Sequence, residues 1–151
     1  MKDFKSINEI LDFAIENEQK AVDFYINLAD RFKHKIMKAS FIDFAKEEMG
    51  HKARLTSIKE KGLYEIKKEE VMDLKIADYI IRTEPSENMS YADALKLAMK
   101  REKAAYRLYL KLSEKAPNED MKKLFLGLAQ EEAKHKLRFE VEYDDFVYKE
   151  N

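Results

Sequence analysis

Two short motifs decide the fold of this chain: Glu-Met-Gly-His at residues 48–51 and Glu-Ala-Lys-His at residues 132–135. Each motif places a glutamate three positions before a histidine. In a helix this spacing puts both side chains on one face, a turn apart, where they can bind one ion. The chain has 3 histidines, and two of them belong to these motifs. The motifs therefore predict two helices that each carry a metal-ligating face.

The two motifs belong to an internal repeat. A shift of 84 residues aligns residues 14–55 with residues 98–139 without a gap, and 14 of the 42 pairs are identical. The repeat predicts a duplicated helical hairpin, and two copies form a pseudo-symmetric bundle rather than a solenoid. Several identical pairs are polar or aromatic: Glu18 with Glu102, Tyr25 with Tyr109, Glu47 with Glu131, Glu48 with Glu132, and His51 with His135.

Apolar residues recur at intervals of three and four along four long segments, which predicts four helices. Their expected ranges are about 6–31, 35–61, 90–116 and 119–146. Ser6 and Ser90 are the predicted N-caps, and Gly62 is the predicted glycine after the second helix. With 3 glycines and 2 prolines, the chain has little material for the many turns of a β-sandwich or barrel.

The lengths of the joins predict how the helices are connected. Short joins make two antiparallel hairpins, at about 6–61 and 90–146. Residues 62–89 form a long crossover between them, in which residues 69–82 resemble a shorter helix. We therefore expect an all-α protein, an antiparallel four-helix bundle with a long crossover between helices 2 and 3, and a single domain over residues 1–151.

The composition excludes several functional classes. Charged residues make up 39% and hydrophobic ones 45%, which is too apolar for a disordered chain and too charged for a membrane span. The 29 basic and 30 acidic residues are nearly balanced, so we expect no nucleic-acid partner. No signal-peptide pattern and no long apolar run is present, so we expect a cytoplasmic protein without a membrane partner. With no cysteine, disulfides, thiolate catalysis, iron–sulfur clusters and cysteine-ligated metals are excluded.

Carboxylates stand on the apolar faces of the first and third predicted helices. Glu18 lies among Ala14, Ile15 and Val22, and Glu102 occupies the equivalent place. A buried carboxylate is penalised by several kcal/mol, and four close together would also repel one another. Two divalent cations would balance four carboxylates, and oxygen donors with imidazole suit iron or manganese. The sequence therefore predicts a dinuclear metal site with six ligands: Glu18, Glu48, His51, Glu102, Glu132 and His135.

This pattern, with each Glu-x-x-His motif 30 residues after a helical glutamate, resembles the ferritin-like diiron-carboxylate family, and within it the rubrerythrin-type proteins. The resemblance covers nearly the whole chain. It implies a ferritin-like bundle and two iron ions, Fe2+ or Fe3+ and oxo-bridged in the oxidised state, for which manganese or zinc can substitute. It also implies the division of the ligands: Glu18 and His51 on one iron, Glu102 and His135 on the other, with Glu48 and Glu132 bridging.

The resemblance implies a non-haem diiron oxidoreductase that reduces hydrogen peroxide in oxidative-stress defence. A full-length rubrerythrin carries a rubredoxin domain with four cysteine ligands, which this chain lacks, so electrons must come from a separate, rubredoxin-like donor protein. Rubrerythrins also have a seventh carboxylate three residues from the ligand on the third helix, where this chain has Met99 and Ala105. By analogy we expect a homodimer, and the likeness of the two halves allows hairpins to be swapped between subunits.

Two alternative functions remain open. One is a ferroxidase or iron-handling protein that oxidises Fe(II) with dioxygen. The other is a non-catalytic helical module that its metal only stabilises. Peroxide, dioxygen and Fe(II) are therefore all candidate small-molecule substrates.

The roles of two further identical pairs are also open. Tyr25 and Tyr109 lie seven residues after the glutamates of their own helices, two turns along the same face. They either pack in the core or donate a hydrogen bond to a ligand carboxylate across the bundle, which makes them candidate catalytic residues. Glu47 and Glu131 are alternative ligands, although we expect them to form salt bridges or to orient the ligands.

Overall fold

The computed structural model describes residues 7–61, 88–116 and 118–150 of the chain. They form four helices, α1 (Ile7–Arg31), α2 (Lys35–Lys61), α4 (Tyr91–Lys115) and α5 (Glu119–Glu150). The described ranges contain no β-strand, so the predicted all-α bundle is confirmed. The predictions for Ser6, Gly62 and the helix at residues 69–82 lie outside the described residues. Within the part of the chain described, no helix has the apolar length needed to span a lipid bilayer.

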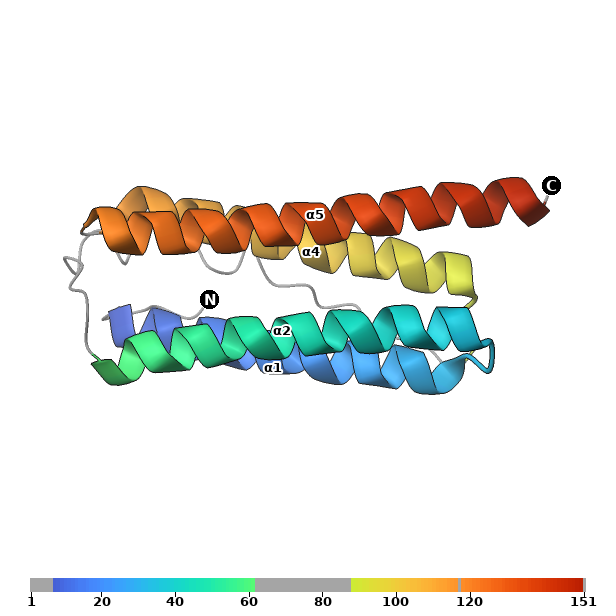
Figure 1. The fold of residues 1–151 in the computed structure, drawn as a ribbon, viewed down its shortest axis with the longest axis horizontal. Helices are drawn as coiled ribbons and strands as arrows, with labels where there is room; N and C mark the ends of the chain where they lie inside the picture. Colours follow the sequence, from blue (N-terminus) through green and yellow to red (C-terminus); the bar gives the residue numbers. More distant parts are fainter. Residues whose placement is uncertain (1–6, 62–87, 117, 151) are drawn as a thin grey trace.

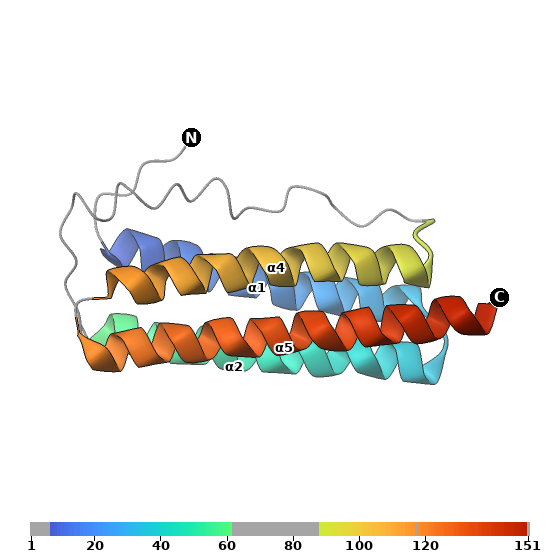
Figure 2. The same cartoon turned by 90° about the horizontal axis from the view of Figure 1, so that it is seen from above.

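The helices are arranged as two antiparallel hairpins that lie side by side. Helix α1 pairs with α2, and α4 pairs with α5 (Figure 1). The view from above shows that α4 runs beside α1 and that α5 runs beside α2 (Figure 2). Side chains join these neighbours: Tyr109 of α4 contacts Glu18 of α1, and Arg54 of α2 contacts Glu131 of α5. The bundle therefore has an α1–α4 side and an α2–α5 side.

The core consists of two apolar clusters near the two ends of the bundle. One cluster is built around residues such as Leu11, Leu55 and Phe125, and the other around Phe41 and Phe139. Burying a large apolar side chain contributes roughly 1.5–3 kcal/mol, so both clusters stabilise the fold. On each helix the sequence passes from one cluster to the other, and the predicted ligands stand between them. The clusters thus hold a polar centre in the middle of the bundle.

The ends of the second hairpin show how the sequence sets helix boundaries. Ser90 is the N-cap of α4, because its Oγ accepts a hydrogen bond from the backbone N–H of Asp93 at 3.1 Å. Asn118 has the same role for α5, since its Oδ1 accepts from the N–H of Met121 at 2.9 Å. Helix α5 continues to Glu150, beyond the expected end near Phe146. Phe146 packs edge-on against Tyr91 at 5.3 Å, and no glycine or proline follows it to end the helix.

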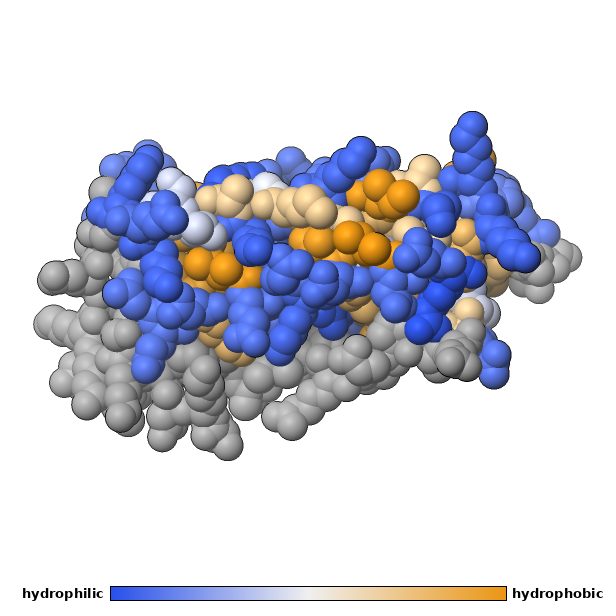
Figure 3. Space-filling view, turned by 90° about the horizontal axis from the view of Figure 1, so that it is seen from below, coloured by the Kyte–Doolittle hydropathy of each residue, from blue (hydrophilic) through white to orange (hydrophobic). Residues whose placement is uncertain are grey.

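The outer face of the first hairpin carries apolar side chains among its charged ones (Figure 3). Ile26 of α1 is 41% exposed, and Ile42 and Met49 of α2 are 36% and 47% exposed. Scattered exposed apolar residues are normal on a soluble domain. These three residues lie on the two helices of the first hairpin.

Candidate metal centre

All six predicted ligands meet in the middle of the bundle. Helices α1 and α4 each contribute one glutamate, and α2 and α5 each contribute a glutamate and a histidine. Their side chains are deeply buried, with residue exposures between 0% and 4%. The six residues are Glu18, Glu48, His51, Glu102, Glu132 and His135.

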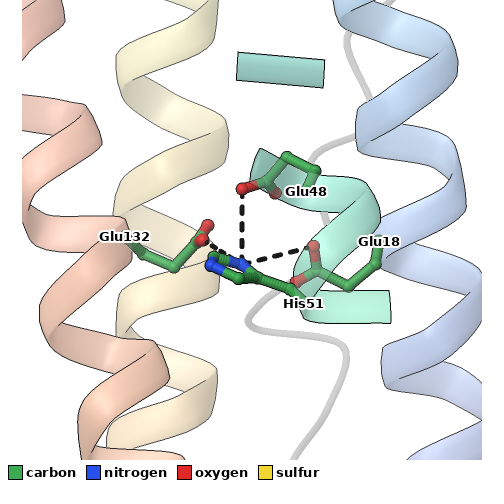
Figure 4. Close-up of side chains that lie close together, drawn as sticks. All are labelled: Glu18, Glu48, His51 and Glu132. Atoms are coloured by element: carbon green, nitrogen blue, oxygen red, sulfur yellow. Dashed lines mark ion pairs between the residues drawn. The ribbon is translucent and has the colours of Figure 1, made fainter. Parts of the chain in front are cut away.

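Around the first histidine, three carboxylates approach one nitrogen (Figure 4). The Nδ1 atom of His51 lies 2.8 Å from Oε1 of Glu132, 3.4 Å from Oε1 of Glu48 and 3.7 Å from Oε2 of Glu18. One ligand atom from each of these four residues lies within 4.8 Å of the others. This is the compact donor set that a single metal ion requires.

The second histidine has an equivalent environment from the other half of the repeat. The Nδ1 atom of His135 lies 3.3 Å from Oε1 of Glu48, 3.5 Å from Oε2 of Glu102 and 3.8 Å from Oε1 of Glu132. Glu48 and Glu132 belong to both donor sets. The rings of His51 and His135 are nearly parallel, with centroids 5.9 Å apart. Two adjacent donor sets with two shared carboxylates are the arrangement that a dinuclear centre needs.

Among the described residues, many buried polar atoms of the centre have no hydrogen bond. Folded proteins leave few such atoms, because each costs free energy to desolvate. Here they cluster at one place, which indicates that a cation is the missing partner. Glutamates and histidines are suitable donors for iron or manganese, so the residues fit two such ions. The unpartnered atoms are Glu18 Oε2, Glu48 Oε1, His51 Nδ1, Glu102 Oε2, Glu132 Oε1 and Oε2, and His135 Nδ1.

The electrostatics of the metal-free centre agree with this interpretation. Burial raises the pKa of Glu48 and Glu132 well above the ordinary glutamate value, and the neighbouring carboxylates raise it further. Burial also opposes charge on His51 and His135, yet the surrounding carboxylates outweigh it and raise the pKa of both imidazoles. Without metal, the centre therefore tends to take up protons in place of cations.

Two buried tyrosines orient the glutamates of the opposite hairpin. The hydroxyl of Tyr25 donates to Oε1 of Glu102, and the hydroxyl of Tyr109 donates to Oε1 of Glu18. In each glutamate the other oxygen, Oε2, stays without a hydrogen bond in the centre. Burial, followed by the nearby carboxylates, raises the pKa of both tyrosines, so they remain protonated donors. The tyrosines pack in the core and also hold the carboxylates.

The glutamates considered as alternative ligands contact the outer side of the histidines. Oε2 of Glu131 lies 2.9 Å from Nε2 of His51, and Oε2 of Glu47 lies 2.8 Å from Nε2 of His135. Both contacts cross from one hairpin to the other. A carboxylate on Nε2 fixes the ring so that Nδ1 faces the centre. Glu47 and Glu131 therefore lie outside the cluster of unpartnered atoms. From there they orient the histidines, which is the role expected for them in place of direct metal binding.

Two arginines that sequence reasoning missed complete this support. Arg54 places Nη2 3.1 and 3.0 Å from the two carboxylate oxygens of Glu131. Arg138 places Nη1 3.2 Å from Oε2 of Glu47. A signal was present, because the two arginines are an identical pair in the repeat and each follows its histidine by three residues. The repeat therefore produces two matching series of contacts on the α2–α5 side, each from an arginine to a glutamate to a histidine. We call them the Arg–Glu–His chains.

A cavity of about 440 Å³ lies on the opposite side, between α1 and α4. All four glutamates of the centre line it, whereas neither histidine does. Other lining residues include Ala21 and Ala105, each three positions after the glutamate of its own helix. Of the two positions considered for a seventh carboxylate, Ala105 is part of the cavity wall. The centre therefore has a carboxylate side next to a cavity and a histidine side closed by ion pairs.

Comparison with known proteins agrees with the fold. A family model described as Rubrerythrin matches residues 9–143. A protein from Thermotoga maritima, described as ferritin-like and diiron-carboxylate, has a structure similar to this one with a TM-score of 0.74, 21% identity, and coverage of 92% of this chain and 95% of its own. A hypothetical protein from Pyrococcus furiosus has a TM-score of 0.74, 26% identity, and coverage of 95% and 91%. No curated protein sequence matches this chain.

Proposed function

The chain belongs to the rubrerythrin family, and from that premise we propose that it is a diiron oxidoreductase that reduces hydrogen peroxide. The observation that carries this proposal is the set of unpartnered buried oxygen and nitrogen atoms on six residues at the middle of the bundle. They surround two adjacent positions with shared carboxylates. A pair of iron ions bound there would supply the two electrons that peroxide reduction consumes.

The proposed division of the ligands follows the two donor sets. Glu18 and His51 would hold one ion, Glu102 and His135 the other, and Glu48 and Glu132 would bridge them. The tyrosine hydroxyls donate to one oxygen of each terminal glutamate, so the second oxygen would be available to bind a metal ion. Manganese or zinc would be bound by the same donors, and iron is proposed because the reaction requires a metal that changes oxidation state.

The two sides of the centre suggest separate routes for substrate and electrons. The cavity between α1 and α4 reaches the carboxylates and can admit peroxide. The α2–α5 side presents the Arg–Glu–His chains, with Arg54 and Arg138 about half exposed. Because the chain has no cysteine for an iron–sulfur or rubredoxin site of its own, a separate electron-donor protein is part of the proposal. By analogy with other ferritin-like bundles, a homodimer is also part of the proposal.

The decisive experiment measures iron content per chain after anaerobic loading with Fe(II), followed by stopped-flow oxidation with peroxide or dioxygen. We expect two irons per chain and faster oxidation by peroxide than by dioxygen. The Glu102→Ala, Glu132→Ala double variant should lose the iron and the reaction. A matched control, Glu114→Ala with Glu140→Ala, removes glutamates outside the centre from the same helices and should keep both.

Other results would contradict the proposal in recognisable ways. One iron or none, or unchanged iron in the double variant, would show that the buried glutamates are structural. Consumption of many Fe(II) ions per chain with dioxygen would favour the iron-oxidising alternative. Two tightly bound ions without turnover by either oxidant would favour a metal-stabilised module.

A further inference from the structure

The cavity between α1 and α4 is much larger than peroxide requires. Its volume of about 440 Å³ falls in the range of pockets that hold drug-sized molecules, roughly 300–1,000 Å³. Hydrogen peroxide has only two heavy atoms. The space next to the glutamates exists because Ala21 and Ala105 each present only a methyl group to it. A substrate with an organic part would fill this space.

One wall of the cavity carries an arginine that forms no ion pair with a carboxylate of the described residues. The guanidinium of Arg101 lies over the ring of Phe24, 4.5 Å from its centroid, and the side chain is half-buried. Among the described residues no carboxylate forms an ion pair with Arg101, whereas Lys20, which also lines the cavity, lies 3.8 Å from Glu16. The residue at the equivalent position of the repeat is Asn17, which also lines the cavity but is uncharged. The cavity beside the pseudo-symmetric centre is therefore asymmetric, because Arg101 carries a positive charge where the equivalent position of the repeat does not.

The charges and the apolar wall together specify an orientation for a ligand. Arg101 attracts a carboxylate and can bind both of its oxygens, which places an anionic group at that wall of the cavity. Phe13, Phe24 and Leu108 offer apolar surface along the cavity. An amphipathic acid would thus place its carboxylate at Arg101 and its uncharged part towards the centre.

We propose that this cavity binds an organic hydroperoxide that carries a carboxylate, with the carboxylate paired to Arg101. This inference rests on the proposed function and names its substrate class. The reaction breaks the O–O bond of ROOH and takes up two electrons and two protons, which yields ROH and water. An iron pair held by the six ligands would supply the two electrons, and the proposed donor protein would restore them.

Binding can be tested without turnover. The chain is loaded with two Zn(II) ions, which do not change oxidation state, and is titrated by calorimetry with octanoate and separately with octan-1-ol. We expect one octanoate site per chain. Octanoate should bind at least about tenfold more tightly than octan-1-ol, because the alcohol cannot form the charge-assisted hydrogen bond with Arg101. Arg101→Gln should weaken octanoate binding by about tenfold or more and leave octanol binding unchanged.

Two further variants locate the site. Ala105→Phe places a ring in the cavity and should abolish octanoate binding, with zinc content and melting temperature measured to show that the variant is folded. Lys103→Gln removes an exposed charge from the same helix outside the cavity and should bind octanoate like the original chain.

The outcomes separate this inference from the proposed function. If octanoate binds no better than octanol, or binds equally well to Arg101→Gln or to folded Ala105→Phe, the inference is overturned. Two irons per chain and hydrogen peroxide reduction by the unmodified chain would then still support the proposed function. A chain that binds no metal would overturn the proposed function, and the substrate assignment with it.

Discussion

Single residues of the centre are oriented mainly by the opposite hairpin. The Tyr109 hydroxyl holds Glu18 across the α1–α4 interface, and the Glu131 carboxylate holds His51 across the α2–α5 interface. In each ligand a second atom then faces the middle of the bundle: Oε2 in Glu18 and Nδ1 in His51. Ligand geometry therefore depends on groups that do not touch the metal themselves.

Removing one tyrosine hydroxyl tests this dependence. Tyr109→Phe keeps the ring that packs on Phe125 but leaves Oε1 of Glu18 without its donor. We expect metal affinity to fall by about tenfold to a hundredfold, measured by competition with a chelator of known affinity. Tyr106→Phe is the matched control on the same helix, because Tyr106 is half-buried and outside the centre. Equal affinities in the two variants would mean that packing alone positions Glu18.

Removing an orienting carboxylate tests the histidine side. Glu131→Ala frees Nε2 of His51, so the ring loses its fixed orientation, and we expect metal affinity to fall by about tenfold or more. Glu131→Gln should restore most of the affinity, since an amide oxygen can still accept from Nε2–H. Gln130→Ala is an exposed control next to it. Failure of the glutamine to restore affinity would show that the charge of Glu131, and not its hydrogen bond, matters.

At the scale of the helices, the elements follow local chemistry. Side-chain caps begin α4 and α5, and basic residues such as Lys61 and Lys115 stand in the last turns of α2 and α4, where they complement the helix dipole. Two glycines depart from this pattern, because Gly50 lies in the interior of α2 and Gly127 lies in the interior of α5. A glycine there weakens the helix, and a Cβ atom at Gly50 would meet nothing within 4 Å.

Gly50→Ala should therefore stabilise the protein. The expected gain in the free energy of unfolding is about 0.5–1 kcal/mol, or a few degrees in melting temperature, measured by denaturation of the metal-free chain. Metal affinity should stay unchanged, because Gly50 is exposed and the added methyl group would contact nothing within 4 Å. A loss of stability would show that another contact requires the glycine, for example in an assembled dimer.

On the scale of the whole molecule, the bundle combines two stable apolar clusters with a destabilising centre. The centre places like charges in a region shielded from water, and only cations or protons relieve the repulsion. Stability, metal content and pH are consequently linked.

We expect the metal-free protein to lose stability as the pH rises from about 5 to about 8. The raised pKa of Glu48 and Glu132 means that the folded state binds protons more strongly, so folding is favoured at low pH and this advantage is lost as pH rises. The raised pKa of His51 and His135 acts in the same direction, because their stabilising charge disappears above the folded value.

In the metal-loaded protein, the contribution of bound metal to stability should change with pH in the opposite direction. Ions compete with protons for the same donors, so the stabilisation by metal should increase with pH. Denaturation of both forms at several pH values measures the difference. If the stability of the metal-free protein did not change over this pH range, the buried carboxylates of the centre would not repel one another appreciably.

Much of the bundle could be predicted from the sequence because its determinants are local and periodic. The ranges of α1 and α2, the Ser90 cap and the gathering of six ligand-type residues on inward helix faces follow from apolar spacing and from the internal repeat. The end of α5 was less predictable, since the contact of Phe146 with Tyr91 lies between residues distant in sequence. Spacing along one helix also cannot tell whether Glu47 or Glu48 faces inward, because both are within reach of the same histidine.

The sequence by itself determined the helices, the duplication and the set of buried donors, because periodicity and residue chemistry are properties of the chain. Only the tertiary structure decided which residues are partners across the hairpins. It determined which tyrosine donates to which glutamate, and which arginine binds the glutamate that contacts each histidine. The cavity with Arg101 on its wall was decided at the same level. These features depend on how α1 meets α4 and how α2 meets α5, and side-chain packing between distant segments sets that geometry.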